Sequence, residues 1–332
     1  MVYLFGFFVC AAIIFFAGKK LSHYGDLLAT KTGMSKGWVG LILMASVTSL
    51  PELMVGISSS AIVGSADLAV GDILGSCAFN LGILAMLDAF TPKDRPLLGI
   101  ASQTHILNAG LGIILIAIVG LAMFIPHDIP ITPWIAFSSI VFIIFYLGSV
   151  RIIYLNEKNH LPEKNIVHEI QNDELSLRTI ITKYALFAAI IIITALALPF
   201  FAEEIAKMTG LGSSFIGTLF LAGSTSLPEI AVSIASIKMG AIDLAIGNLL
   251  GSNIFNVLIL AIDDIFYARG LLLRDSSSFH LISVIGIIMM SSVVIISLSF
   301  RARGKRFFMA WDAILIFMIY FFNLFLLYRF TQ

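Results

Sequence analysis

The 332-residue sequence has few charged residues and almost no cysteine. Only 12% of its residues are Asp, Glu, Lys or Arg, whereas 59% are hydrophobic. The two cysteines, Cys10 and Cys77, both lie in apolar stretches, so neither a disulfide framework nor a cysteine-rich metal site is indicated. The formal net charge is zero, which offers no argument for nucleic-acid binding. This composition is that of an integral membrane protein surrounded by a lipid bilayer, not of a soluble globule.

Ten apolar stretches are long enough to span a bilayer, which takes roughly 20 residues. They fall near residues 2–18, 37–62, 67–90, 98–124, 131–153, 180–202, 212–238, 241–266, 278–300 and 308–328. No basic segment precedes the first stretch, so we interpret it as a retained membrane helix and not as a cleaved signal. The expected fold class is therefore an all-α membrane protein with ten transmembrane helices.

A polar, charged segment at residues 154–179 divides the chain into a five-helix repeat at 1–153 and another at 180–332. Lys and Arg concentrate in the odd-numbered loops, which include this linker. The positive-inside rule then predicts a cell-membrane protein with a cytoplasmic linker and both termini outside. Because five is odd, the second half enters the membrane in the opposite sense. Similar halves of opposite orientation form an inverted repeat, an architecture typical of secondary transporters.

Two sequence blocks occur once in each half. Thr-Ser-Leu-Pro-Glu stands at residues 48–52 and again at 225–229. The blocks at 67–80 and 243–256 are identical at nine of fourteen positions. A buried glutamate beside a helix-breaking proline, at matching places in two halves, points to an ion site.

The first block predicts a broken helix that presents oxygen atoms. Pro51 has no amide hydrogen, so the helix kinks and carbonyls near 45–47 lose their partners. Glu52 follows Thr48 by four residues and Ser49 by three, so helical geometry places the three side chains on one face. The second half repeats this arrangement with Pro228, Glu229, Thr225, Ser226 and the carbonyls near 222–224.

The second block predicts a polar stripe on an otherwise apolar helix. Asp72, Ser76 and Asn80 are spaced four residues apart, as are Asn248, Ser252 and Asn256 in the other half. Glycines at 71 and 75, and at 247 and 251, would let a neighbouring helix approach closely. All these potential ligands are hard oxygens, which suit Ca²⁺ or Na⁺ and not zinc or copper. No organic cofactor is expected.

The blocks resemble the α-repeats of the calcium/cation antiporter superfamily, in particular its sodium/calcium exchanger branch of the prokaryotic type. The matching windows are 41–80 and 218–256, and the ten-helix layout extends the resemblance over most of the chain. The resemblance implies an antiporter that exchanges Ca²⁺ for Na⁺ by alternating access, with the first and sixth helices sliding against the rest. It also implies these ligands: Glu52, Glu229, Thr48, Ser49, Thr225, Ser226, Ala45, Ala222, Ser76, Asn80, Ser252 and Asn256.

Departures from the family pattern leave the counter-ion open. Cys77 replaces an asparagine, and Asp72 stands where the second half has Asn248. Asp72 and Asn248 are further candidates for the site, and the carboxylate count leaves H⁺/Ca²⁺ exchange and K⁺-dependent Na⁺/Ca²⁺ exchange as alternatives. A cation channel is a remoter alternative, because channels usually have symmetry about the membrane normal. The sequence leaves the oligomeric state open.

Two further interpretations concern the class of protein and the remaining acidic residues of the predicted helices. An enzyme is not expected, because Gly71-Asp72 lacks the flanking pattern of an intramembrane aspartyl protease and no HExxH motif is present. Asp88, Asp263, Asp264 and Asp312 lie near predicted helix ends and are interpreted as interfacial residues.

Overall fold

The computed structural model describes residues 2–124, 130–132, 135–160, 175–209, 223–301, 304–305 and 308–330. In this part of the chain, nine helical spans are long and apolar enough to cross a bilayer. The predicted span at 212–238 lies partly outside the described residues, and its described part includes α11 (Leu227–Lys238). The chain is a multi-pass, mainly helical membrane protein, as its composition predicts.

The first half runs from α1 to α8. Helix α1 is longer than the predicted 2–18 span, because it continues through Lys19 and Lys20 without a break. The second span alternates between α-helical and π-helical turns before the chain continues into α5. In order, the elements are α1 (Val2–Thr32), α2 (Lys36–Trp38), η1 (Val39–Met44), α3 (Ala45–Thr48), α4 (Leu50–Ile57), η2 (Ser58–Val63), α5 (Ala66–Asp88), α6 (Leu97–Ile100), α7 (Thr104–Phe124) and α8 (Phe137–His160).

Two predicted spans of the first half have different boundaries in the structure. The stretch predicted at 98–124 is broken between α6 and α7, where the Ser102 amide donates to Asp243 instead of continuing a helix. The stretch predicted from 131 begins with a short antiparallel hairpin of β1 (Pro130–Thr132) and β2 (Ile135–Ala136). Prolines at 130 and 133 lack the amide hydrogen that a helix interior needs, so α8 begins only at Phe137. It then continues to His160, inside the predicted linker.

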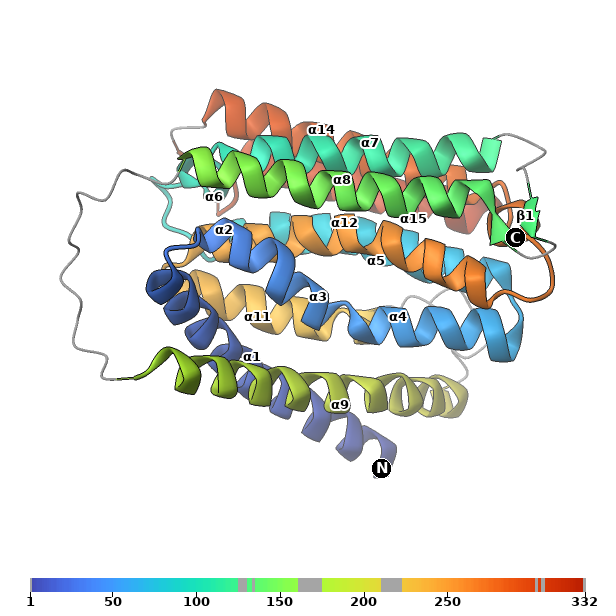
Figure 1. The fold of residues 1–332 in the computed structure, drawn as a ribbon, viewed down its shortest axis with the longest axis horizontal. Helices are drawn as coiled ribbons and strands as arrows, with labels where there is room; N and C mark the ends of the chain where they lie inside the picture. Colours follow the sequence, from blue (N-terminus) through green and yellow to red (C-terminus); the bar gives the residue numbers. More distant parts are fainter. Residues whose placement is uncertain are drawn as a thin grey trace.

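The second half repeats this order with α9 (Leu177–Thr209), α11, α12 (Ile242–Phe266), α13 (Leu272–Asp275), α14 (His280–Phe300) and α15 (Trp311–Phe330). Helices α5 and α12 pack together at the centre and are the most buried of the described spans. Figure 1 shows α1 and α9 beside each other at one edge, with α7, α8, α14 and α15 on the opposite side. Phe321, Phe322 and Phe325 on α15 are exposed, as expected for lipid-facing side chains.

Glycines set the closest helix contact at the centre of the molecule. A Cβ at Gly247 would overlap the Gly37 carbonyl, and one at Gly251 would overlap the Leu41 backbone. The predicted close approach to α12 is therefore confirmed, and the partner is the α2–η1 segment. Gly64 and Gly240 occupy equivalent places before α5 and α12, and both have positive φ (68° and 76°), which permits the sharp turn there.

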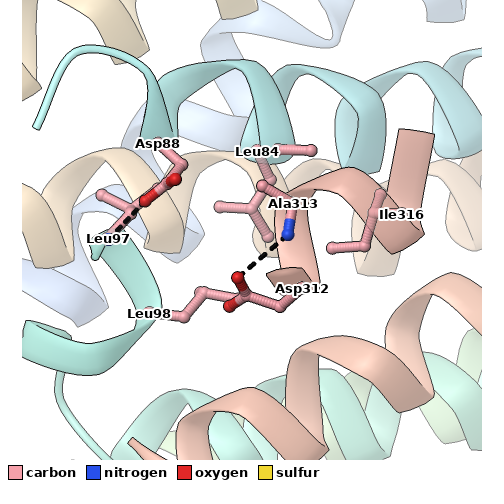
Figure 2. A pocket seen from close by; sticks show the side chains of 8 residues that line it. Leu84, Asp88, Leu97, Leu98, Asp312, Ala313 and Ile316 are labelled. Carbon is pink, nitrogen blue, oxygen red and sulfur yellow. Dashed lines mark hydrogen bonds between the residues drawn. The ribbon is translucent and has the colours of Figure 1, made fainter. Parts of the chain in front are cut away.

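Asp88 joins the two halves at one end of the bundle. Its carboxylate accepts hydrogen bonds from the Leu97 amide (2.8 Å) and from the Ala310 amide (2.7 Å), just before α15. Figure 2 shows the Leu97 bond, with Asp312 on the far side of the same small pocket. Lys305, whose side chain is fully buried, lies 3.4 Å from Asp88 and also donates to Thr91. Asp88 therefore links the α5–α6 connection to the start of α15.

Asp264 does the same at the opposite end. It follows Asp243 by the same number of residues as Asp88 follows Asp67, so the two acids are equivalent. Asp264 accepts hydrogen bonds from the Leu272 amide (2.8 Å) and from the Ala136 amide (2.9 Å), just before α8. Ser139 supplies the remaining donor at 2.6 Å, where Asp88 has a lysine. Asp88, Asp264 and Asp312 lie near helix ends, as the sequence predicts, and their side chains are buried inside the protein.

A second pair of acids repeats this cross-linking. Asp67 in the first turn of α5 accepts from the Ser277 amide (2.6 Å) and lies 3.2 Å from the His280 ring. Asp243 in the first turn of α12 accepts from the Ser102 amide (2.8 Å) and lies 3.1 Å from the His105 ring. Each acid thus holds the helix start of the opposite half, at opposite ends of the bundle.

Candidate functional site

Both Thr-Ser-Leu-Pro-Glu blocks contain a helix break one residue before the leucine. Ser49 (φ −90°, ψ 5°) separates α3 from α4, and Ser226 (φ −85°, ψ 8°) precedes α11. In both cases the proline occupies the first turn of the following helix, where its missing amide hydrogen has no cost. The glutamate therefore lies in the first turn of a helix that starts at mid-span.

The two glutamates are bonded across the halves in a reciprocal way. Ser226 donates to Glu52 Oε1 at 3.3 Å, and Ser49 donates to Glu229 Oε1 at 3.2 Å. Ser252 adds a longer bond to Glu229 at 3.4 Å. Both glutamates are 1% exposed and close enough for their charges to repel each other. The two carboxylates thus face one shared, buried space.

Several oxygens of the predicted site have no hydrogen-bond partner among the described residues. They are Oε2 of both glutamates and one oxygen each of Ser76, Asn80 and Asn256, and all are buried. Unpaired buried oxygens are costly, and they are rare in folded proteins unless they bind something. They come from α4, α5, α11 and α12, which carry the four repeated blocks.

Other predicted residues are occupied by protein contacts. Thr48 donates to Asn248 Oδ1 at 3.3 Å and lies equally near the Ala45 carbonyl. That carbonyl also accepts the Ser49 amide at 3.0 Å, so it is less free than the proline argument predicts. Thr225 is fully buried beside the second break. Ala222 lies outside the described residues.

Asn253, which the sequence analysis did not single out, and Cys77 orient the amide groups of the site. Asn253 donates to the Cys77 carbonyl at 3.1 Å and accepts from Asn80 at 3.1 Å. Asn256 donates to the Cys77 sulfur at 3.5 Å. These bonds leave the carbonyl oxygens of Asn80 and Asn256 without a donor in the described part of the chain. Gly-Ser-Asn at 251–253, where the first half has Gly-Ser-Cys, is the sequence signal that could have included Asn253.

The negative charge of the site comes from a small number of carboxylates. Among the described residues, no three His, Cys, Asp or Glu side chains gather as a metal cluster. The pair Glu52 and Glu229 is instead surrounded by neutral hydroxyl and amide oxygens. Asp72 is near enough to interact electrostatically with Glu52, and its buried Oδ2 has no partner in the described part of the chain. Such an arrangement can hold a hard cation of modest charge.

Comparison with known proteins identifies the family. Residues 2–155 and 181–329 match the family described as "Sodium/calcium exchanger protein". The chain belongs to this family. This membership confirms the resemblance predicted from the two repeated blocks.

Individual relatives agree with the family match. The chain is 30% identical over 250 residues to "Putative antiporter CaxA" of Alkalimonas amylolytica, covering 74% of this chain and 75% of that protein. It is 34% identical over 125 residues to the sodium/calcium exchanger MaX1 of Methanosarcina acetivorans, covering 36% and 33%. Its fold is similar to that of the sodium-calcium exchanger NCX_Mj, with a TM-score of 0.75, 19% identity and 97% of each chain covered.

The exchanger family sets the class of activity. This family member is a membrane cation antiporter and not an enzyme, as the sequence predicts. The likeness to NCX_Mj also confirms the predicted fold of ten helices in two inverted five-helix repeats. The hydrogen bonds between the halves follow the same inverted symmetry. Asp88 and Asp264 make equivalent bonds, as do Asp67 and Asp243.

Proposed function

We propose that this antiporter exchanges Ca²⁺ for Na⁺, and that both ions bind between Glu52 and Glu229. The observation that carries the proposal is the set of five buried oxygens without hydrogen-bond partners in the described residues, contributed by both repeats. The family and the names of the relatives MaX1 and NCX_Mj support the choice of ions.

The chemistry of the five oxygens favours these ions. Two carboxylates balance one Ca²⁺, and Ca²⁺ accepts 6–8 oxygen ligands in flexible geometry. The unpaired oxygens of Ser76, Asn80 and Asn256 add neutral ligands. Mg²⁺ is a poorer fit, because it demands an octahedron and gives up its water reluctantly. Na⁺ is also a hard cation, so the same oxygens can serve the two ions in turn.

Alternating access needs a part of the molecule that moves past the site. Helices α1 and α9 pack on each other along their length and lie at the edge of the bundle in Figure 1. The contact of α1 with α11 includes small and apolar residues, since Gly18 lies against Ala231 and Val232. Few polar bonds cross it, among them that from Ser22 to the Val232 carbonyl at 2.9 Å. We assign the sliding motion to this helix pair, past the two glutamate-bearing helices.

Sidedness follows from the loop charges. The end of the bundle that carries α6 and the start of α9 has most of the lysines and arginines. The proposal places this end in the cytoplasm of a cell membrane and the two termini outside.

The counter-ion is tested by transport into vesicles. Purified protein is reconstituted, and Ca²⁺ uptake is measured against Na⁺, H⁺ or K⁺ gradients imposed one at a time. Uptake driven by the Na⁺ gradient alone is the expected result. Uptake that follows a pH gradient and ignores Na⁺ would replace Na⁺ by H⁺ as the counter-ion. Ca²⁺ flux without any counter-ion would overturn the proposed exchange altogether.

A further inference from the structure

Asp263 is a buried acid that the proposed ion site does not use. It lies on α12, is 0% exposed, and neither carboxylate oxygen has a hydrogen-bond partner among the described residues. The next residue, Asp264, is fully bonded to three donors. Successive helical residues point about 100° apart, so the two neighbouring carboxylates face different surroundings. The structural role of Asp264 therefore does not explain Asp263.

The Asp263 carboxylate lies against α4. A Cβ at Gly56 would overlap its oxygens, so only a glycine permits this approach. Gly56 follows Glu52 by one helical turn, which places Asp263 next to the main site and toward the end of α4. Asp263 also interacts electrostatically with Asp72, which in turn interacts with Glu52. Half-buried Asp72 therefore connects the two buried acids, Glu52 and Asp263, electrostatically.

The hydroxyl oxygen of Ser60 is a second, independent indication that a ligand binds here. Ser60 follows Gly56 by four residues and lies in η2, which packs against α12. Its hydroxyl is 2% exposed and lacks a partner within the described part of the chain. A buried hydroxyl normally finds a hydrogen bond, and an unpaired one costs free energy. The same is true of Asp72 Oδ2.

The opposite half shows that the fold does not need this arrangement. The residues equivalent to Asp72, Gly56, Ser60 and Asp263 are Asn248, Ser233, Ile237 and Leu87. There the Asn248 amide donates to Ser233 at 3.2 Å and its carbonyl accepts from Thr48 at 3.3 Å. The four residues there are neutral, whereas the set around Asp263 has two acids and buried oxygens that lack partners among the described residues.

We propose that Asp72 and Asp263, with the Ser60 hydroxyl, form a second binding site for a hard cation, Na⁺ or Ca²⁺. The two neighbouring carboxylates repel each other, and a bound cation removes both that repulsion and the cost of the buried oxygens that lack partners among the described residues. The site lies between the Glu52–Glu229 pair and the end of the bundle that carries the β1–β2 hairpin and the α12–α13 connection. An ion bound there lies next to the central Glu52–Glu229 site. The proposal rests on the proposed cation exchange for its choice of ions, but its binding can be measured separately.

The test uses full-length purified protein and equilibrium binding of ⁴⁵Ca²⁺ and ²²Na⁺. Glu52→Gln with Glu229→Gln removes the central charges, and a saturable binding component for one of the two ions is expected to remain. Adding Asp263→Asn should weaken that component at least about tenfold, since even an outer-shell partner of a metal site is worth that much. The isotope that is retained identifies the ion. Asp275→Asn, an acid at the same end paired with Arg274, is the matched control and should leave binding unchanged.

Thermal unfolding guards against a variant that simply misfolds. Without Na⁺ or Ca²⁺, Asp263→Asn should unfold at the same or a higher temperature than the parent chain, because it removes an unpaired buried charge. The temperature rise on adding the cation should shrink. A lower unfolding temperature with an undiminished cation response would show a purely structural acid and overturn the second site. Undiminished ⁴⁵Ca²⁺ binding in the central double variant, by contrast, would count against the proposed central site.

Discussion

Asp72 on α5 and Asn248 on α12 occupy equivalent positions in the two halves, yet their surroundings differ. Asn248 is hydrogen-bonded to two neutral side chains, Thr48 and Ser233. Asp72, which is half-buried, interacts electrostatically with two buried acids, Glu52 and Asp263. The acids that join the halves, by contrast, are the same on both sides: Asp67 with Asp243, and Asp88 with Asp264. The acids that join the halves are therefore repeated in both, whereas the equivalent positions 72 and 248 differ in charge.

The largest expected effect tests the symmetry of the centre. Glu52→Gln and Glu229→Gln each remove one of two facing charges with little change in volume. Both should reduce Ca²⁺ transport in vesicles to background, because one carboxylate cannot balance a divalent cation. Membrane insertion should stay normal, since an amide is easier to insert than a carboxylate. Asp94→Asn, an exposed acid in a loop, is the control and should transport normally. Normal transport by either glutamine variant would remove the assigned central role.

A smaller effect distinguishes the two ends of the bundle. Lys305→Met leaves Asp88 buried without its cation and should lower the free energy of unfolding by about 3–5 kcal/mol. Ser139→Ala removes a hydrogen bond to Asp264 and should lower it by about 1.5–3 kcal/mol. Chemical unfolding in detergent, followed by circular dichroism, measures both. Equal losses in the two variants would mean that the lysine adds nothing beyond a hydrogen bond.

The smallest effect compares the two histidines that bond the helix starts. His105→Ala and His280→Ala each remove a hydrogen bond to an equivalent acid, worth about 0.5–1.5 kcal/mol. His105 should give the larger loss, because its side chain is fully buried while that of His280 is 16% exposed. The shift in midpoint of the same unfolding curves is the measurement. A larger loss for His280 would contradict the role given to burial.

Much of the fold could be predicted because its signals are local. Apolar length marked the spans, and the repeated Thr-Ser-Leu-Pro-Glu blocks predicted a helix break that the structure has at Ser49 and Ser226. Helix ends were predicted less well, because charge inside a helix does not end it. Helix α1 continues through Lys19 and Lys20, and α8 continues to His160. The π-helical turns η1 and η2 had no sequence signal that we recognised.

The candidate site was predictable only where its residues sit in the repeats. Spacing along one helix suggested that Ser76 and Asn80 share a face, but it could not show which oxygens stay unpaired. That depends on partners far away in sequence, such as Asn253, which takes the Asn80 amide. The burial of Asp263 was not predicted for the same reason. Its place near a helix end suggested an interfacial side chain, whereas the contact with Gly56 on a distant helix buries it.

The reciprocal bonds between the halves also bear on how the chain is made. Ser277 and Ala310, which donate to Asp67 and Asp88, are translated long after α5 has emerged from the ribosome. The Ser49 hydroxyl likewise acquires its acceptor only when Glu229 arrives. Domains usually fold as units, the N-terminal one first during synthesis. Here the first five helices must wait in the bilayer with polar groups unmatched, so native packing is a late event that follows insertion of the last helix.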